Sequence, residues 1–181
     1  IALQLHLGVQ APVYETGLRS GILNEYQTRR FTPDMMVVNA MKAVIEDAFP
    51  YRAQGATLLE EMIEKGKRLY LLQRTLPHVP DSLQLGFTTA QWEGCQANEA
   101  LIWNYFVKND LLFGKDPMLN QNYLKDGPKT PELGEGAPGY IGLFVGRRIV
   151  EQFMKNQPET SMEALMKMPA TALFETARYK P

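Results

Sequence analysis

Three glutamates fall at a spacing that can support metal chemistry. Glu60, Glu61 and Glu64 occupy the first turns of the segment 57-TLLEEMIEKGKRLYLL-72. A zinc-protease helix carries His, Glu and His at this spacing, because the outer side chains then lie one turn apart and the middle carboxylate can act as general base. Both histidine positions hold glutamate here. The spacing is that of a metal site, whereas the residue types are not those of a zinc site.

The same glutamates also fit an ordinary amphipathic helix. Thr57 and Glu60 have the spacing of a capping box, which satisfies backbone donors at a helix start. Two glutamates each have an oppositely charged residue four positions later, a spacing that supports a helix. The pairs are Glu61–Lys65 and Glu64–Arg68. This interpretation accounts for all three carboxylates and predicts a solvated acidic face.

Glu99 is the second candidate for chemistry, because it stands among aromatic residues. The segment 88–109 is predicted to form one helix with Glu99 in the middle of its apolar arc. The arc consists of Trp92, Cys95, Ile102, Trp103 and Phe106. A carboxylate buried there needs a partner, and arginine pairs well with carboxylate. Arg147 is the first candidate, because it lies at the edge of the apolar stripe of the helix predicted over residues 139–156. If the arc faces a cleft or an interface, Glu99 is solvated instead.

A Pro/Gly-rich loop is the candidate for binding. The segment 126-DGPKTPELGEGAPG-139 is longer than a tight turn between helices requires, and loops of this kind often carry function. Its prolines restrict the backbone, so the loop could present Pro131, Leu133 and the following Tyr140 at low entropic cost. The alternative is that the loop only bridges distant helix ends.

These candidates must be positioned by helices. Capping and proline signals predict helices over residues 33–49, 57–76, 88–109 and 139–156, and a shorter one after Thr160. Residues 1–7 alternate as a half-buried strand does, and a lone strand needs partners. We therefore expect a mostly α (α+β) fold in a single domain over residues 1–181, and a longer protein of which this chain is the C-terminal part.

Composition narrows the function classes. The 181 residues are 45% hydrophobic and 22% charged, as in globular domains, and no apolar run is long enough to span a bilayer. A net charge of −1 gives no electrostatic footprint for nucleic acid. The single cysteine, Cys95, excludes an internal disulfide and a cysteine-based zinc site, and the two histidines, His6 and His78, are far apart in sequence.

Several long stretches resemble one family. The chain is similar, over nearly its whole length, to the gliding motility-associated lipoprotein GldB family of Bacteroidetes. The similarity is carried by TLLEEMIEKGKRLYLL, QANEALIWNYFVKNDLLF, YLKDGPKTPELGEGAPGYIGLFVGRRIVEQFMKN and ARYKP, together with LGVQAPVY and RRFTPDMMV.

That family in turn resembles predicted zinc-dependent proteases with an HExxH helix. The resemblance places Glu60 and Glu64 at the two histidine positions, Glu61 at the catalytic glutamate position and Glu99 at the acidic third position. It implies a degenerate zincin-like fold, with helices packed on a small sheet and an N-terminal part missing. Because neither histidine is present, an all-carboxylate site would suit calcium or magnesium better than zinc.

The resemblance also implies a location and two functions. It implies a lipoprotein at the periplasmic face of the cell envelope, anchored by a lipid upstream of this chain, with partners in the motility or secretion machinery. The first functional hypothesis is a non-catalytic interaction module that has lost its metal and needs no cofactor. The alternative is a metal-dependent hydrolase that uses a carboxylate-bound metal. Metal content would separate the two.

Overall fold

The chain folds as an assembly of helices. The structure, a computed structural model, describes residues 7, 8, 10–134 and 136–181. The predicted mostly helical character is confirmed. In chain order the elements are α1 (Pro12–Arg19), α2 (Glu25–Thr28), α3 (Pro33–Ala48), α4 (Leu58–Thr75), α5 (Asp81–Leu85), α6 (Thr89–Ala97), α7 (Glu99–Lys108), α8 (Pro117–Leu124), η2 (Pro131–Leu133), α9 (Ile141–Asn156), α10 (Met162–Lys167) and α11 (Ala170–Ala177).

The small sheet expected from the sequence is not observed. The described ranges contain no strand. The expectation rested on residues 1–7, and residues 1–6 of that segment lie outside the described residues. The arrangement of the helices gives no support to a zincin-like fold. The fold class is therefore corrected to α-helical for the part of the chain that the structure describes.

The long helices begin where their capping signals predict. The α3 helix starts with Pro33 directly after Thr32, and α4 starts after Thr57, whose hydroxyl accepts the backbone N–H of Glu60. Thr88 and Gln91 form the equivalent capping box at α6. Near the C-terminus, the cap is Ser161 rather than the neighbouring Thr160. Side-chain oxygens at these positions satisfy amides that would otherwise lack a partner.

The helix predicted over residues 88–109 is interrupted. It divides at Asn98 into α6 and α7. The Asn98 side-chain amide donates to the carbonyl of Gly94 at 2.8 Å, as does the Asn98 backbone N–H at 3.1 Å. Asparagine competes in this way for backbone groups and favours helix ends over helix interiors. The prediction of one continuous helix is wrong for that reason, and Glu99 begins a new helix.

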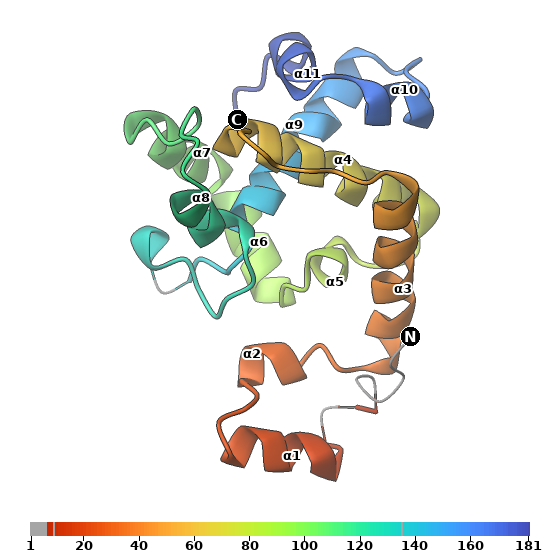
Figure 1. Ribbon diagram of the computed structural model, residues 1–181, viewed down its shortest axis with the longest axis vertical. Coiled ribbons are helices and arrows are strands. Elements are labelled where there is room, and N and C mark those ends of the chain that lie inside the picture. Colours follow the sequence, from red (N-terminus) through yellow and green to blue (C-terminus); the bar gives the residue numbers. More distant parts are fainter. Residues whose placement is uncertain (1–6, 9, 135) are drawn as a thin grey trace.

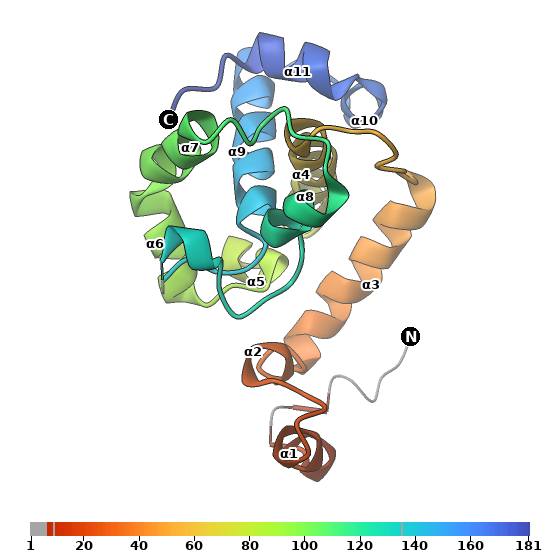
Figure 2. The same ribbon diagram turned by 60° about the vertical axis from the view of Figure 1, so that its left-hand side comes forward.

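The centre of the molecule is the crossing of α4 and α9, which lie side by side in Figures 1 and 2. Glycines let the two backbones meet there. A Cβ atom on Gly146 would lie 1.8 Å from the backbone oxygen of Met62, and one on Gly66 would lie 2.3 Å from the backbone carbon of Gly146. No side chain fits at either position, so glycine at both is what allows the backbones of α4 and α9 to touch.

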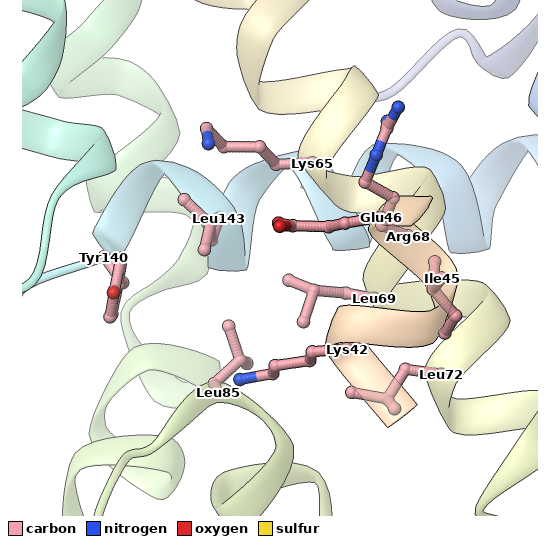
Figure 3. Close-up of a pocket in the computed structure, with 10 residues that line it drawn as sticks. All are labelled: Lys42, Ile45, Glu46, Lys65, Arg68, Leu69, Leu72, Leu85, Tyr140 and Leu143. Carbon is pink, nitrogen blue, oxygen red and sulfur yellow. The ribbon is translucent and has the colours of Figure 1, made fainter. Parts of the chain in front are cut away.

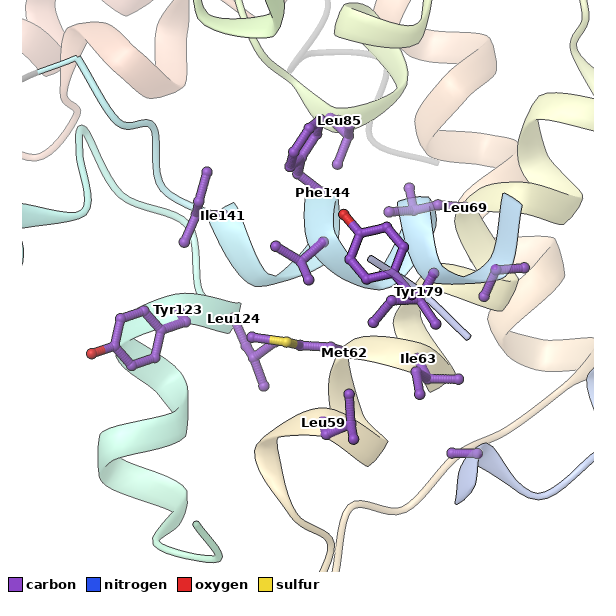
Figure 4. Close-up of a cluster of buried hydrophobic side chains, with 14 of the residues drawn as sticks. Leu59, Met62, Ile63, Leu69, Leu85, Tyr123, Leu124, Ile141, Phe144 and Tyr179 are labelled. Carbon is purple, nitrogen blue, oxygen red and sulfur yellow. The ribbon is translucent and has the colours of Figure 1, made fainter. Parts of the chain in front are cut away.

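Side chains from several elements close over this crossing. Figure 4 shows Met62 and Leu59 of α4 gathered with Leu124 of α8 and with Ile141 and Phe144 of α9. The α11 helix packs on both α9 and α4, and α3 packs along α4. The α1 and α2 helices extend away from the core beyond the start of α3 (Figure 1). Within the described residues, no helix is both long and apolar enough to cross a membrane.

Candidate functional site

Glu60 closes the start of α4. Its carboxylate accepts the backbone N–H of Thr57 at 2.7 Å and the Thr57 hydroxyl at 2.9 Å. These hydrogen bonds, the backbone one first, hold the pKa of Glu60 below its ordinary value. The predicted capping box is confirmed. The backbone N–H and the hydroxyl of Thr57 thus both donate to the carboxylate that the resemblance places at a metal-ligand position.

Glu61 is buried, not solvated. Only 5% of the residue is exposed, and its carboxylate accepts the side-chain amide of Asn120 at 3.0 Å. The segment before α8 brings Asn120 there, since the N–H groups of Leu58 and Leu59 donate to the carbonyls of Gly114 and Leu112. The predicted solvated position of Glu61 beside Lys65 is therefore wrong. A contact from some sixty residues away covers this side of α4.

Glu64 holds two cations. It lies 2.5 Å from Lys67 Nζ and 3.2 Å from Arg68 Nη1, so the predicted Glu64–Arg68 pair is confirmed. Lys67 is fully buried and also donates to the carbonyl of Met168, between α10 and α11. Arg68 donates to the carbonyl of Phe49 at the end of α3. Glu64 thus holds the two cations that connect α4 to the end of α3 and to the segment between α10 and α11.

The three carboxylates therefore do not point to a common centre. Glu60 is bound to Thr57, Glu61 to Asn120, and Glu64 to its two cations. Within the described ranges, no three His, Cys, Asp or Glu side chains stand close enough together to hold a metal ion. What the arrangement does chemically is to satisfy backbone donors and neutralise buried cations.

Glu99 is partnered, as predicted, but by a different arginine. Its two oxygens accept from Arg148 Nε at 2.9 and 3.0 Å, and Oε1 also accepts the hydroxyl of Tyr179 at 2.7 Å. Burial, and then the bond to Glu99, raise the pKa of the Tyr179 phenol well above its ordinary value. Glu99, on α7, therefore connects Tyr179 of the C-terminal segment with Arg148 of α9. The predicted pair of Glu99 with Arg147 is not the one that forms.

Arg147 has its own partners. It is fully buried, with Nη2 lying 2.6 Å from Asp81 and Nε lying 2.8 Å from Glu151. Its guanidinium stacks 5.3 Å from the centre of the Trp92 ring, a favourable cation–π geometry. Because α7 starts anew after Asn98, Trp92 and Glu99 belong to different helices. The aromatic ring therefore contacts Arg147, while the carboxylate contacts the next arginine.

The Pro/Gly-rich loop is closed by its own hydrogen bonds. The backbone N–H of Tyr140 donates to Lys125 at 3.0 Å, so the two ends of the loop are in contact. Inside it, the hydroxyl of buried Thr130 donates to the carbonyl of Pro138 at 2.7 Å. The alternative that the loop bridges distant helix ends is thereby contradicted. Compact surface loops whose ends meet often carry binding residues.

Leu133 of this loop forms one wall of an apolar groove. The groove has a volume of about 400 Å³ and lies between the loop, α6 and α7. Its other walls include Leu101, Ile102, Ala137, Ile141 and, at its base, Cys95. Burial raises the pKa of the Cys95 thiol to about 12. Most of the residues that line the groove are apolar, as in a site for an apolar segment.

The three residues predicted as one interaction surface are divided. Leu133 lines the groove, Pro131 is exposed, and Tyr140 lines a different cavity between α3, α4 and α9. Half of the exposed large apolar side chains in the described residues lie between residues 101 and 119 of the sequence. These are Leu101, Val107, Phe113, Met118 and Leu119, of which Leu101 lines the groove.

The sequence contains a start signal for the helix that carries two of these exposed side chains. Asp116 before Pro117 is a typical helix start, and in the structure the Asp116 carboxylate accepts the N–H of Met118 at 2.9 Å. That signal predicts α8, which presents Met118 and Leu119. The short α1, α2 and α5 helices were also missed.

Comparison with known proteins now identifies the family. Neither the curated proteins nor the solved structures contain a match to the chain. A family model described as gliding motility protein GldB matches residues 1–181. The predicted GldB resemblance is thereby confirmed, whereas the relation to zinc-dependent proteases stays a prediction. With all 181 residues matched, the chain belongs to the GldB family of gliding motility lipoproteins.

Proposed function

We propose that this chain acts as one non-catalytic interaction domain of a gliding motility lipoprotein. It would work at the periplasmic face of the envelope, held there by a lipid anchor upstream, and would bind proteins of the motility or secretion machinery. Its α4 helix would descend from a metalloprotease helix. Membership in the GldB family supports the motility role, and the engaged state of Glu60, Glu61, Glu64 and Glu99 supports loss of catalysis.

The apolar groove between α6, α7 and the loop carries the proposal. Leu101, which lines the groove, is 68% exposed, so its apolar side chain is available to a partner. Leu133 also lines the groove, on a loop in which the Thr130 hydroxyl is bonded to the carbonyl of Pro138. Such internal bonds reduce the entropy that a loop loses on binding. The partner we infer is a protein segment with an apolar side chain that contacts these two leucines.

The test is a substitution in the lining of the groove. Leu101→Glu in the full-length protein is expected to abolish restoration of gliding in a strain that lacks its own copy. A charge placed in an apolar contact weakens binding by about tenfold or more. Because Leu101 is exposed, the free energy of unfolding should change by no more than about 0.5 kcal/mol.

Val44→Glu is the matched control. Val44 is 60% exposed on α3, which lies on the opposite side of the molecule from α7 in both views (Figures 1 and 2). This variant should restore gliding fully at the same cellular abundance. Normal gliding by the Leu101→Glu variant, with protein levels equal to those of the unsubstituted protein, would contradict the proposal.

A further inference from the structure

A second cavity lies apart from the groove, between α3, α4, α5 and the start of α9. Its volume is about 170 Å³. Aliphatic side chains form its floor: Ile45, Leu69, Leu72, Leu85 and Leu143. Figure 3 shows Lys42 and Glu46 of α3 and Lys65 of α4 extending across this floor toward Tyr140 and Leu143. The cavity thus combines an apolar base with a charged wall.

The charges on that wall are only partly balanced by the protein. Arg68 is paired with Glu64, but neither Lys42, Lys65 nor Glu46 has an ion pair in the described part of the chain. Two unpaired cations and one unpaired carboxylate leave an excess positive charge. A charge that lies in a partly buried cavity without a partner is costly, and an anion entering the cavity would lower that cost.

Lys42 shows the effect most clearly. Lys42 is partly buried, and this burial, with help from nearby Arg30, lowers the pKa of Lys42 to about 8, although Asp126 and Glu46 oppose the shift. Arg30 itself is paired with Asp126. Lys42 forms no salt bridge with either carboxylate among the described residues, so its charge is only partly compensated. Bound anion at this position would stabilise the charged form.

Tyr140 completes the cavity in an unusual conformation. Its φ angle of 62° is left-handed, which is strained for a bulky side chain. Burial raises the pKa of its phenol, so the hydroxyl stays protonated and can donate a hydrogen bond. Tyr140 is one of the residues that line the cavity and lies at its edge in Figure 3. Strained residues of this kind cluster at ligand sites.

We propose that this cavity binds an anionic amphiphile, meaning a carboxylate or phosphate group attached to a short apolar chain. Lys42 and Lys65 would hold the anionic group, Tyr140 would donate to it, and the aliphatic floor would cover the apolar chain. Two sources have this chemistry, a free fatty acid and a lipid phosphate. This site is independent of the groove, so its failure would leave the interaction proposal standing.

The test is calorimetric titration of the purified protein with octanoate and with octyl phosphate. At least one should bind, and octyl glucoside, which has no charge, should not. Lys42→Met and Lys65→Met should each weaken binding by about tenfold, because each removes a charge-assisted contact. Preference for octanoate identifies the fatty acid as the source, and preference for octyl phosphate identifies the lipid phosphate.

Glu46→Gln is the matched variant with the opposite sign. It removes the one unpaired carboxylate beside Lys42, so binding should tighten by about threefold or more. Opposite effects from neighbouring residues cannot come from a general loss of folding. The proposal is overturned if neither amphiphile binds, if octyl glucoside binds equally well, or if the three substitutions leave the affinity unchanged.

Discussion

Gly146→Ala is expected to destabilise the protein more than any other single change considered, by about 3 to 5 kcal/mol. The added Cβ would lie 1.8 Å from the backbone oxygen of Met62, and backbone atoms of a central helix cannot move aside alone. The α4 and α9 helices would have to separate along their whole crossing, which opens the core that Figure 4 shows. Urea unfolding of the purified protein measures the change.

Gly94→Ala is the control for that prediction. Gly94 also lies inside a helix, α6, but nothing stands within 4 Å of the Cβ it would gain. Alanine should therefore stabilise the protein by about 0.5 to 1 kcal/mol through its better helix propensity. If Gly146→Ala leaves the stability within 1 kcal/mol of the unsubstituted protein, the close crossing of α4 and α9 is wrong.

Glu64→Ala is expected to cost about 3 kcal/mol, because it leaves the fully buried Lys67 ammonium without its carboxylate. The reverse change should cost less. In Lys67→Met the apolar stem is kept, and Glu64 retains Arg68 as a partner. The double variant should be more stable than the sum of the single changes predicts, by about 1 to 3 kcal/mol, since removing both charges strands neither.

The control for this cycle is another ion pair within one helix. Glu163 and Lys167 lie 2.6 Å apart on α10, but both are solvent-exposed. Glu163→Ala should leave the stability unchanged within error, because exposed pairs contribute little. Strict additivity in the Glu64 and Lys67 cycle would show that the two residues do not depend on each other, contrary to the structure.

Local signals predicted the local structure well. Thr57 and Thr88 cap the helices that their spacing predicts, because a cap depends only on residues three positions apart. The GldB resemblance was likewise readable from contiguous stretches and is confirmed over the whole chain. These inferences need no knowledge of how distant segments pack.

Predictions that depended on distant contacts failed. Glu61 has the pattern of a solvated residue, and only its contact with Asn120 buries it. Arg147 was the expected partner of Glu99 because it lies at the edge of the apolar stripe over residues 139–156, whereas the break at Asn98 starts a new helix at Glu99, which pairs with Arg148. An assignment of helix faces from periodicity assumes an unbroken helix. A single break, such as the one at Asn98, changes the face on which every later side chain lies.

The direction of the loop side chains was also beyond the sequence. Leu133 and Tyr140 were grouped as one surface, yet they line separate cavities on two sides of the loop. The contact between Tyr140 and Lys125, and the left-handed backbone of Tyr140, set these directions. Neither feature has a signature in a Pro/Gly-rich stretch, where many closed conformations share the same composition.

Glu61→Gln tests most directly whether α4 has a structural rather than a catalytic role. Glutamine has nearly the same shape, and its side-chain oxygen can still accept from Asn120, so the fold should be preserved. Glutamine cannot act as a general base, which is the role that the protease resemblance assigns to this position. The measurement is restoration of gliding by the full-length variant, alongside its unfolding free energy. Normal gliding is the predicted result; loss of gliding at unchanged stability would contradict the account.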